Sequence, residues 1–190
     1  MISRDSYIKQ IEPFIDKPFV KVMTGIRRSG KSVILRLLRD ELIRRGVADD
    51  HIIYMNFESF EWIDIHDSKA LYTYIRSCIE DKDTYYILLD EVQEVEEWEK
   101  AVNSFLVDFN SDVYVTGSNS KMLSSELATY LTGRYVSFHI MTLSFKEYLR
   151  FHDLSLDMQG LNIKEEFVKY LRSGGFPAIH TADYTYETIY

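Results

Sequence analysis

The chain has 190 residues, a length that can bury one domain core with a small appendage. Hydrophobic residues make up 46% of the chain and aromatic residues 14%, a composition that excludes a disordered protein. The formal net charge of -8 argues against a general nucleic-acid binder, because such a protein needs a basic face. A net negative charge does not exclude local basic patches.

The first predicted elements are a strand, a glycine-rich loop and a helix. Phe19–Met23 is a short apolar run of the kind that forms a buried strand. Gly25–Ser32 fits the phosphate-binding pattern G-x-x-x-x-G-K-[ST], in which backbone N–H groups surround phosphates, Lys31 reaches the outer phosphates and Ser32 ligates magnesium. Apolar residues at helical spacing then run to Gly46, so a helix N-terminus faces the phosphates. The predicted nucleotide-contacting residues are Gly25, Ile26, Arg27, Arg28, Ser29, Gly30, Lys31, Ser32 and Val33.

The alternative interpretation of this segment is a glycine turn that only joins the strand to the helix. Arg27 and Arg28 occupy variable positions of the pattern, so these two side chains fit either solvent exposure or a contact with phosphates or a partner. The order of strand, loop and helix favours the nucleotide-binding interpretation.

Strand-like and helix-like segments alternate along the rest of the chain. Apolar runs rich in β-branched and aromatic residues indicate strands, and apolar residues at every third or fourth position indicate helices. This alternation favours a mainly parallel sheet that is covered by helices on both faces. The predicted strands are 51–57, 85–89, 113–115 and 134–140, and the predicted helices are 68–81, 96–109 and 122–131.

Two acidic residues, Asp90 and Glu91, follow the apolar run Tyr85–Leu89. Open parallel sheets bind their ligands beyond the carboxyl ends of the strands, which is where these two side chains are expected. Asp90 can hold magnesium there, opposite Ser32, and Glu91 can orient or deprotonate an attacking water molecule. The alternative interpretation is a solvated strand end, because further acidic residues follow as far as Glu99.

Polar residues also follow the fourth predicted strand, in the run Thr116–Asn119. If this strand lies between the strand before the glycine-rich loop and the strand before Asp90, such side chains can contact the outermost phosphate or position the attacking water. Asn119 is the first candidate for this role and Ser118 the second. The alternative is a turn whose Asn or Ser caps the helix before Met122, and the two roles are compatible.

Several segments, in the order in which they occur, resemble the AAA+ superfamily of ATPases. They are GIRRSGKS, YYILLDEVQ, VYVTGSNS and LTGRYVSFHIMTLSFKEYL, followed by GGFP. Within the superfamily the chain is most similar, from about Ile2 to about Ile179, to predicted bacterial and archaeal ATPases that carry a C-terminal domain of unknown function. The resemblance implies an α/β P-loop NTPase fold: a three-layer α/β/α sandwich with a mainly parallel five-stranded sheet, strand order 5-1-4-3-2, and a partial helical lid.

The resemblance also implies roles for individual residues. Its Gly-Arg step falls on Gly133–Arg134, so Arg134 is a candidate that stabilises charge on the transferring phosphoryl group, in trans from a neighbouring subunit or in cis. A surface arginine after a helix-ending glycine is the alternative. The implied catalytic set is Lys31, Glu91, Asn119 and Arg134, and the implied metal ligands are Ser32 and Asp90.

We expect two regions, an ATPase core over residues 1–150 and a partial helical lid, or linker to a missing C-terminal domain, over 151–190. Ile163–Arg172 predicts one lid helix, and Gly174–Pro177 interrupts the pattern after it. The chain ends at Tyr190, near where the ATPase part of the resembled family gives way to its C-terminal domain. We therefore expect this chain to be part of a longer protein.

The predicted function is magnesium-dependent ATP binding and hydrolysis that switches or drives a partner. The alternatives are a P-loop kinase for small molecules or nucleotides, and a slow nucleotide-dependent signalling or binding module. A GTP switch is disfavoured because the chain has no Asn-Lys-x-Asp motif. Homo-oligomers are possible, and nucleic acid is an expected partner only through the missing domain. The single cysteine, Cys78, and the lack of a membrane-length apolar stretch predict a cytoplasmic protein without a membrane partner.

Overall fold

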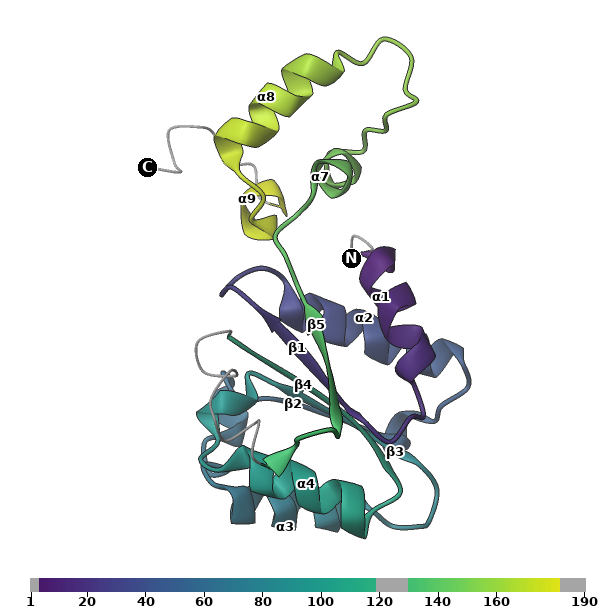
Figure 1. Ribbon diagram of the computed structural model, residues 1–190, viewed down its shortest axis with the longest axis vertical. Helices are drawn as coiled ribbons and strands as arrows, with labels where there is room; N and C mark the ends of the chain where they lie inside the picture. The colour runs from purple at the N-terminus through teal and green to yellow at the C-terminus, as the bar shows by residue number, and fades with distance from the viewer. Residues whose placement is uncertain (1–3, 119–129, 182–190) are drawn as a thin grey trace.

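A fully parallel sheet forms the centre of the molecule (Figure 1). The computed structural model describes residues 4–118 and 130–181. Five strands follow the order β2-β3-β4-β1-β5, which confirms the predicted order. The sheet was predicted to be mainly parallel, and in the structure every neighbouring pair of these strands is parallel. The strands are β1 (Val20–Gly25), β2 (Ile52–Asn56), β3 (Tyr85–Asp90), β4 (Ser111–Ser118) and β5 (Tyr135–His139).

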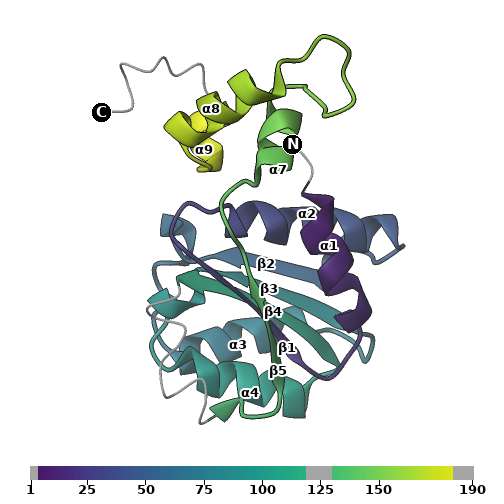
Figure 2. The same cartoon turned by 45° about the horizontal axis from the view of Figure 1, so that its top comes forward.

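Helices cover both faces of the sheet and complete the predicted three layers. The first face carries α1 (Asp5–Ile11) and α2 (Lys31–Arg44) (Figures 1 and 2). The opposite face carries α3 (Ser68–Cys78) and α4 (Trp98–Asp108). None of the helices in the described part of the chain is long and apolar enough to cross a membrane.

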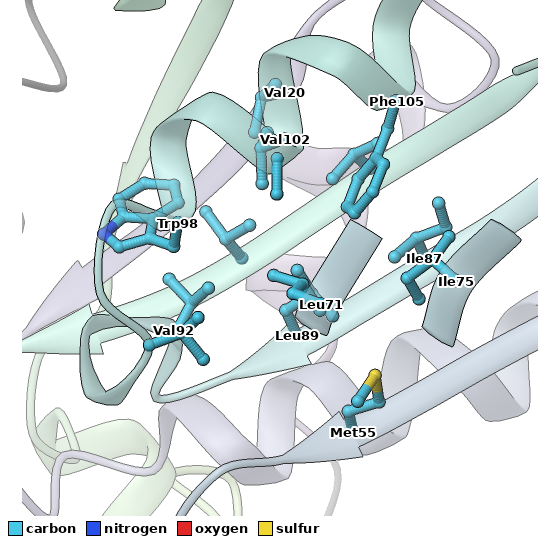
Figure 3. Packing of buried hydrophobic residues seen from close by; sticks show 14 of the residues in the cluster. Val20, Met55, Leu71, Ile75, Ile87, Leu89, Val92, Trp98, Val102 and Phe105 are labelled. Atoms are coloured by element: carbon cyan, nitrogen blue, oxygen red, sulfur yellow. The ribbon is translucent and has the colours of Figure 1, made fainter. Parts of the chain in front are cut away.

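The core is divided between the two faces of the sheet, and β3 shows how the sequence produces this division. Ile87 and Leu89 pack against α3 and α4 (Figure 3), whereas Tyr86 and Leu88 belong to the cluster beneath α2. Successive strand residues point to opposite faces, and in a parallel sheet both faces are buried. The strand therefore has a continuous apolar sequence, which is why the strands could be predicted.

Three helices follow β5 and form a partial lid beyond the carboxyl ends of the strands (Figure 1). A capping box of Ser144 and Glu147 starts the first of them, and aromatic rings of the first two helices pack on each other. A hydrogen bond joins the connector between β5 and the first lid helix to the segment before the third lid helix. In it the Leu143 N–H donates to the Gly175 carbonyl at 2.7 Å. The lid helices are α7 (Phe145–Phe151), α8 (Ile163–Ser173) and α9 (Pro177–Thr181).

The structure differs from the predicted elements mainly at their ends. Helix α3 stops at Cys78 instead of residue 81, and α4 starts at Trp98 instead of residue 96 because Glu97 has a left-handed backbone (φ 53°). The predicted helix 122–131 lies almost entirely outside the described residues. Helices α1, α7 and α9 were not predicted, because each is seven residues long or shorter and shows too few turns for a periodic pattern.

A buried ion pair lies at the amino-terminal edge of the sheet. Lys21 and Asp112 form a hydrogen-bonded salt bridge, and their side chains are 0% and 2% exposed. The Asp112 carboxylate also accepts hydrogen bonds from the Tyr114 hydroxyl at 2.7 Å and from the Asp16 N–H at 2.9 Å. Burial lowers the pKa of Lys21 and raises that of Asp112, so each charge depends on its partner.

We expect Lys21→Met to lower the free energy of unfolding by about 3 to 5 kcal/mol, because it leaves a buried carboxylate without its cation. Lys21→Met combined with Asp112→Asn should lose much less, since no uncompensated charge remains. Urea unfolding of both variants measures the difference. Equal losses in the single and the double variant would contradict this account.

Candidate nucleotide-binding site

The glycine-rich loop joins the end of β1 to the start of α2 and has the backbone that its glycines allow. Gly30 has φ of 99° and Arg28 has φ of 67°, both in the left-handed region. A Cβ atom at Gly25 would lie 2.3 Å from the Ile140 carbonyl oxygen and 2.9 Å from the Ser29 Oγ. The loop therefore needs glycine at position 25 for close packing and at position 30 for its turn.

Helix α2 directs its N-terminus at this loop. Its buried side chains hold the helix on the sheet, and among them are Ile34, Leu35, Leu38 and Leu42. Its N-cap residue, Gly30, has no side chain that could cap the first-turn N–H groups. The Val33 N–H donates to the Gly30 carbonyl at 3.1 Å, which leaves the N–H groups of Lys31 and Ser32 and the positive end of the helix dipole to an anion.

Lys31 lies at the centre of the site. Its side chain is 2% exposed, and its Nζ atom lies 3.3 Å from the Glu91 Oε1. The same Nζ donates long hydrogen bonds of 3.5 Å to the carbonyls of Gly25 and Ile26. The ammonium group is therefore fixed between the loop and the end of β3.

Asp90 is fully buried, and the donors that its carboxylate accepts from within the described residues are hydroxyl groups. It accepts hydrogen bonds from the Thr116 hydroxyl at 2.5 Å, from the Tyr54 hydroxyl at 3.2 Å and from the Ser32 side chain. Burial raises the pKa of Asp90, and these hydrogen bonds only partly oppose that effect. No ion pair joins Asp90 to a cationic side chain within the described ranges. The oxygen donors of Ser32 and Asp90, and a carboxylate without a cation, fit a Mg²⁺ ion.

Glu91 follows directly and has a strained backbone, with φ of 54°. Its N–H donates to the Thr116 Oγ1 at 2.9 Å, and its Oε2 accepts from the Gln93 Nε2 at 2.6 Å. Thr116 thus connects both acidic residues, because the same hydroxyl donates to Asp90. The sequence identified Thr116 only as the start of a polar run, and Tyr54 and Gln93 gave no signal, because their hydrogen bonds depend on strand register and on a loop turn.

Lys31, Ser32 and Glu91 line a cavity of about 500 Å³, whereas Asp90 is fully buried behind it. The lid contributes to it through α9, a contribution that the sequence did not predict because α9 is only five residues long. Glu58 also lines the cavity and forms an exposed ion pair with Arg27 at 3.2 Å. The lining residues are Arg27, Arg28, Gly30, Lys31, Ser32, Val33, Glu58, Glu91, Pro177, Ala178 and Thr181.

Of the two residues predicted near the end of β4, the structure describes one. Ser118 ends β4 and pairs in register with Gly25, so it lies beside the start of the loop. Asn119 lies outside the described residues. The roles of both residues toward a phosphate stay predictions.

Arg134 lies at the opposite edge of the sheet from the loop. Its carbonyl accepts a hydrogen bond from the Val20 N–H at 2.8 Å, and its Nη1 donates to the Asn103 Oδ1 at 3.1 Å. Val20 starts β1 and Gly25 ends it, a separation of about 17 Å along a strand. This distance disfavours a contact in cis with a nucleotide in the loop, and a role in trans and an ordinary surface position both stay open.

The sequence profile of a family described as "AAA domain" matches residues 17–149. The chain belongs to this family, which confirms the resemblance to AAA+ ATPases. Two relatives are uncharacterised proteins: one from Haemophilus influenzae, 45% identical over 184 residues, and one from Methanocaldococcus jannaschii, 37% identical over 188 residues. Each match covers 96% of this chain but only 46% and 40% of the relatives, so the chain spans less than half of their length.

Solved AAA+ structures have the same fold. The chain is similar to AMPPCP-bound DnaA from Aquifex aeolicus, with a TM-score of 0.57 and 17% identity over 93% of this chain and 58% of that one. It is also similar to Cdc6p from Pyrobaculum aerophilum (TM-score 0.53, 10% identity, 79% and 48% covered) and to S. cerevisiae Hsp104 from a casein complex (0.56, 12%, 94% and 36%). At these identities the similarity shows the fold.

We expect Thr116→Val to lower the free energy of unfolding by about 1 to 3 kcal/mol, because it leaves the Glu91 N–H and one Asp90 oxygen buried without partners. Thr116→Ser keeps the hydroxyl and should retain most of the stability. Denaturant unfolding with an unchanged m-value measures the effect. A valine variant as stable as the parent would show that Thr116 does not hold the two acidic residues.

Proposed function

We propose that this domain binds a nucleoside triphosphate, ATP, as its magnesium complex and hydrolyses it. The observation that supports this most strongly is the convergence of Lys31, Ser32, Asp90 and Glu91 beside one cavity at the carboxyl edge of the sheet. The matching DnaA structure holds AMPPCP, a triphosphate analogue, in a protein of the same fold. The basic residues of the loop that line the cavity, Arg27, Arg28 and Lys31, fit a phosphate chain better than a large apolar ligand.

The loop and the metal ligands have separate roles in this proposal. Backbone N–H groups at the start of α2 bind phosphate oxygens, and Lys31 offsets the charge of the outer phosphates. Ser32 and Asp90 would hold Mg²⁺, which when bound supplies positive charge to the phosphate oxygens. The position of Lys31 supports its role, because contacts with Glu91 and with the Gly25 carbonyl already hold its ammonium group at the loop.

Glu91 is the proposed general base. Its carboxylate is 11% exposed, faces Lys31 across the cavity and is oriented by Gln93. A triphosphate would compete with this carboxylate for the Lys31 ammonium, which leaves Glu91 to accept a proton from an attacking water molecule. A water-activating glutamate is a disadvantage in a kinase, which must exclude water, so the site favours hydrolysis over phosphoryl transfer to a second substrate.

Lys31→Ala and Glu91→Gln should separate binding from hydrolysis. Lys31→Ala removes the cation, so calorimetric titration with Mg-ATP should show at least about a tenfold loss of affinity, or about 1.4 kcal/mol. Glu91→Gln should keep the affinity and hydrolyse ATP about 10² to 10⁴ times more slowly. Lys9→Ala and Glu96→Gln change exposed residues and serve as matched controls. No binding of Mg-ATP by the parent would reject the proposed function, and parental turnover in Glu91→Gln would reject Glu91 as the base.

The position of Arg134 supports a role in trans and therefore an oligomer. We propose that a neighbouring subunit delivers this guanidinium to the phosphates, because Arg134 is exposed at the far edge of its own sheet. This domain would then switch or drive its partner as an assembly.

If Arg134 acts in trans, turnover per protomer should rise with protein concentration. Mixing Arg134→Ala with Lys31→Ala protein should restore activity that neither variant has alone, because one intact interface can form between an intact loop and an intact arginine. ATPase assays over a concentration series of the full-length protein measure both effects, with Arg44→Ala as a surface control. Concentration-independent turnover without complementation would leave Arg134 as a surface arginine.

A further inference from the structure

Arg4, which precedes α1, is buried to an unusual degree for an arginine and connects three distant segments. Its side chain is 1% exposed. Its Nη1 donates to the carbonyl of Ser29 in the glycine-rich loop at 2.9 Å, and its Nη2 donates to the Met141 carbonyl at 3.0 Å. Its Nε donates to the Glu147 Oε1 in α7 at 2.8 Å. One guanidinium therefore joins the N-terminal segment to the loop and to the base of the lid.

The bond to Ser29 acts on the part of the loop that faces the phosphates. The peptide bond from Ser29 to Gly30 is planar and trans, so its carbonyl and the Gly30 N–H point in opposite directions. A carbonyl fixed toward Arg4 turns this N–H away from Arg4, and Gly30 lines the cavity. Gly30 also has a left-handed backbone, so without an external restraint this peptide can turn over at little cost.

The bond to Glu147 acts on the lid. The Glu147 carboxylate also accepts hydrogen bonds from the N–H and the hydroxyl of Ser144, both at 2.9 Å, which start α7. Burial by itself raises the pKa of Glu147, but the hydrogen bonds from Arg4 and Ser144 outweigh burial and hold the pKa below its usual range. The carboxylate therefore stays ionised and keeps its pairing with Arg4.

The lid also reaches this loop residue. An ideal Cβ atom on Gly30 would lie 3.4 Å from the Arg4 Nη1 and 3.6 Å from the Cγ of Pro177, the first residue of α9. Helix α9 is tied to the connector through the bond between Leu143 and Gly175. The loop, the connector and the lid thus form one contiguous set of contacts around Arg4.

We propose that Arg4 is a positioning residue of the nucleotide site, which fixes the peptide bond between Ser29 and Gly30 and couples the glycine-rich loop to the base of the lid. The expected effect of Arg4 on Mg-ATP binding rests on the proposed function, whereas its expected effect on the loop backbone does not. An arginine is required because its planar fork donates from three separate nitrogens to the loop, the connector and α7, whereas the donors of a lysine ammonium all radiate from one nitrogen.

The first test is Arg4→Lys, which keeps the charge and the pairing with Glu147 but loses the fork. Native-state hydrogen exchange without nucleotide should be about tenfold faster at residues 26–33 and unchanged in the sheet core, because the restraint is local. Mg-ATP affinity should fall about tenfold. Arg44→Lys, an exposed arginine paired with Glu41, is the matched control and should change neither quantity.

A second variant covers the case in which Arg4→Lys fails to fold. Arg4→Met combined with Glu147→Gln removes both charges, so no unpaired charge is left in the interior. It should show the same faster exchange in the loop, whereas Glu147→Gln alone keeps the bond to Ser29 and should stay within about threefold of the parent. Parental exchange of the loop in a folded Arg4 variant would overturn the proposal. Failure of the parent to bind Mg-ATP would reject the proposed function and leave the exchange test of Arg4 valid.

Discussion

Parallel pairing of β1 with β4, and of β4 with β3, is the constraint on which the site depends. In parallel strands all the carboxyl ends lie at one edge, so residues that are more than sixty positions apart along the chain become neighbours. The glycine-rich loop ends β1, the acidic pair ends β3, and Ser118 ends β4 at that edge. The same rule places Arg134, which precedes β5, at the opposite edge. The sheet therefore places the candidate nucleotide-binding residues at one edge and Arg134 at the other.

At that edge, neutral hydrogen bonds orient the two acidic residues, and Glu91 also forms an ion pair with Lys31. Thr116 donates to Asp90 and accepts from Glu91, so a single hydroxyl of the middle strand orients two acidic residues. Asp90 stays buried among hydroxyl donors, and Glu91 faces Lys31 instead. Two adjacent carboxylates in different surroundings can take different roles, one as a metal ligand and the other as a base. The difference between their surroundings is a property of the folded site and not of the residue pair.

The lid and the N-terminal segment contribute to the site through polar contacts. Arg4 and Glu147 are 143 positions apart, yet they form one buried pair that also holds a loop carbonyl. Burying a guanidinium is unfavourable unless it is paired and hydrogen-bonded, and here carbonyls and a carboxylate accept hydrogen bonds from all three of its nitrogens. A buried pair of this kind specifies one arrangement of loop and lid, because any shift leaves a charge without its partner.

The sequence by itself determined the strands, their order through the resemblance, the glycine-rich loop, and the identities of Lys31, Ser32, Asp90 and Glu91 as candidates. These features are local: apolar runs, glycine positions and adjacent residues are visible in a short window. Only the tertiary structure decided that Thr116 joins the acidic pair, that Arg134 lies away from its own loop, and that Arg4 contacts Ser29 and Glu147. The physical reason is that such contacts depend on strand register and on side chains from distant segments, and neither leaves a periodic pattern in the chain.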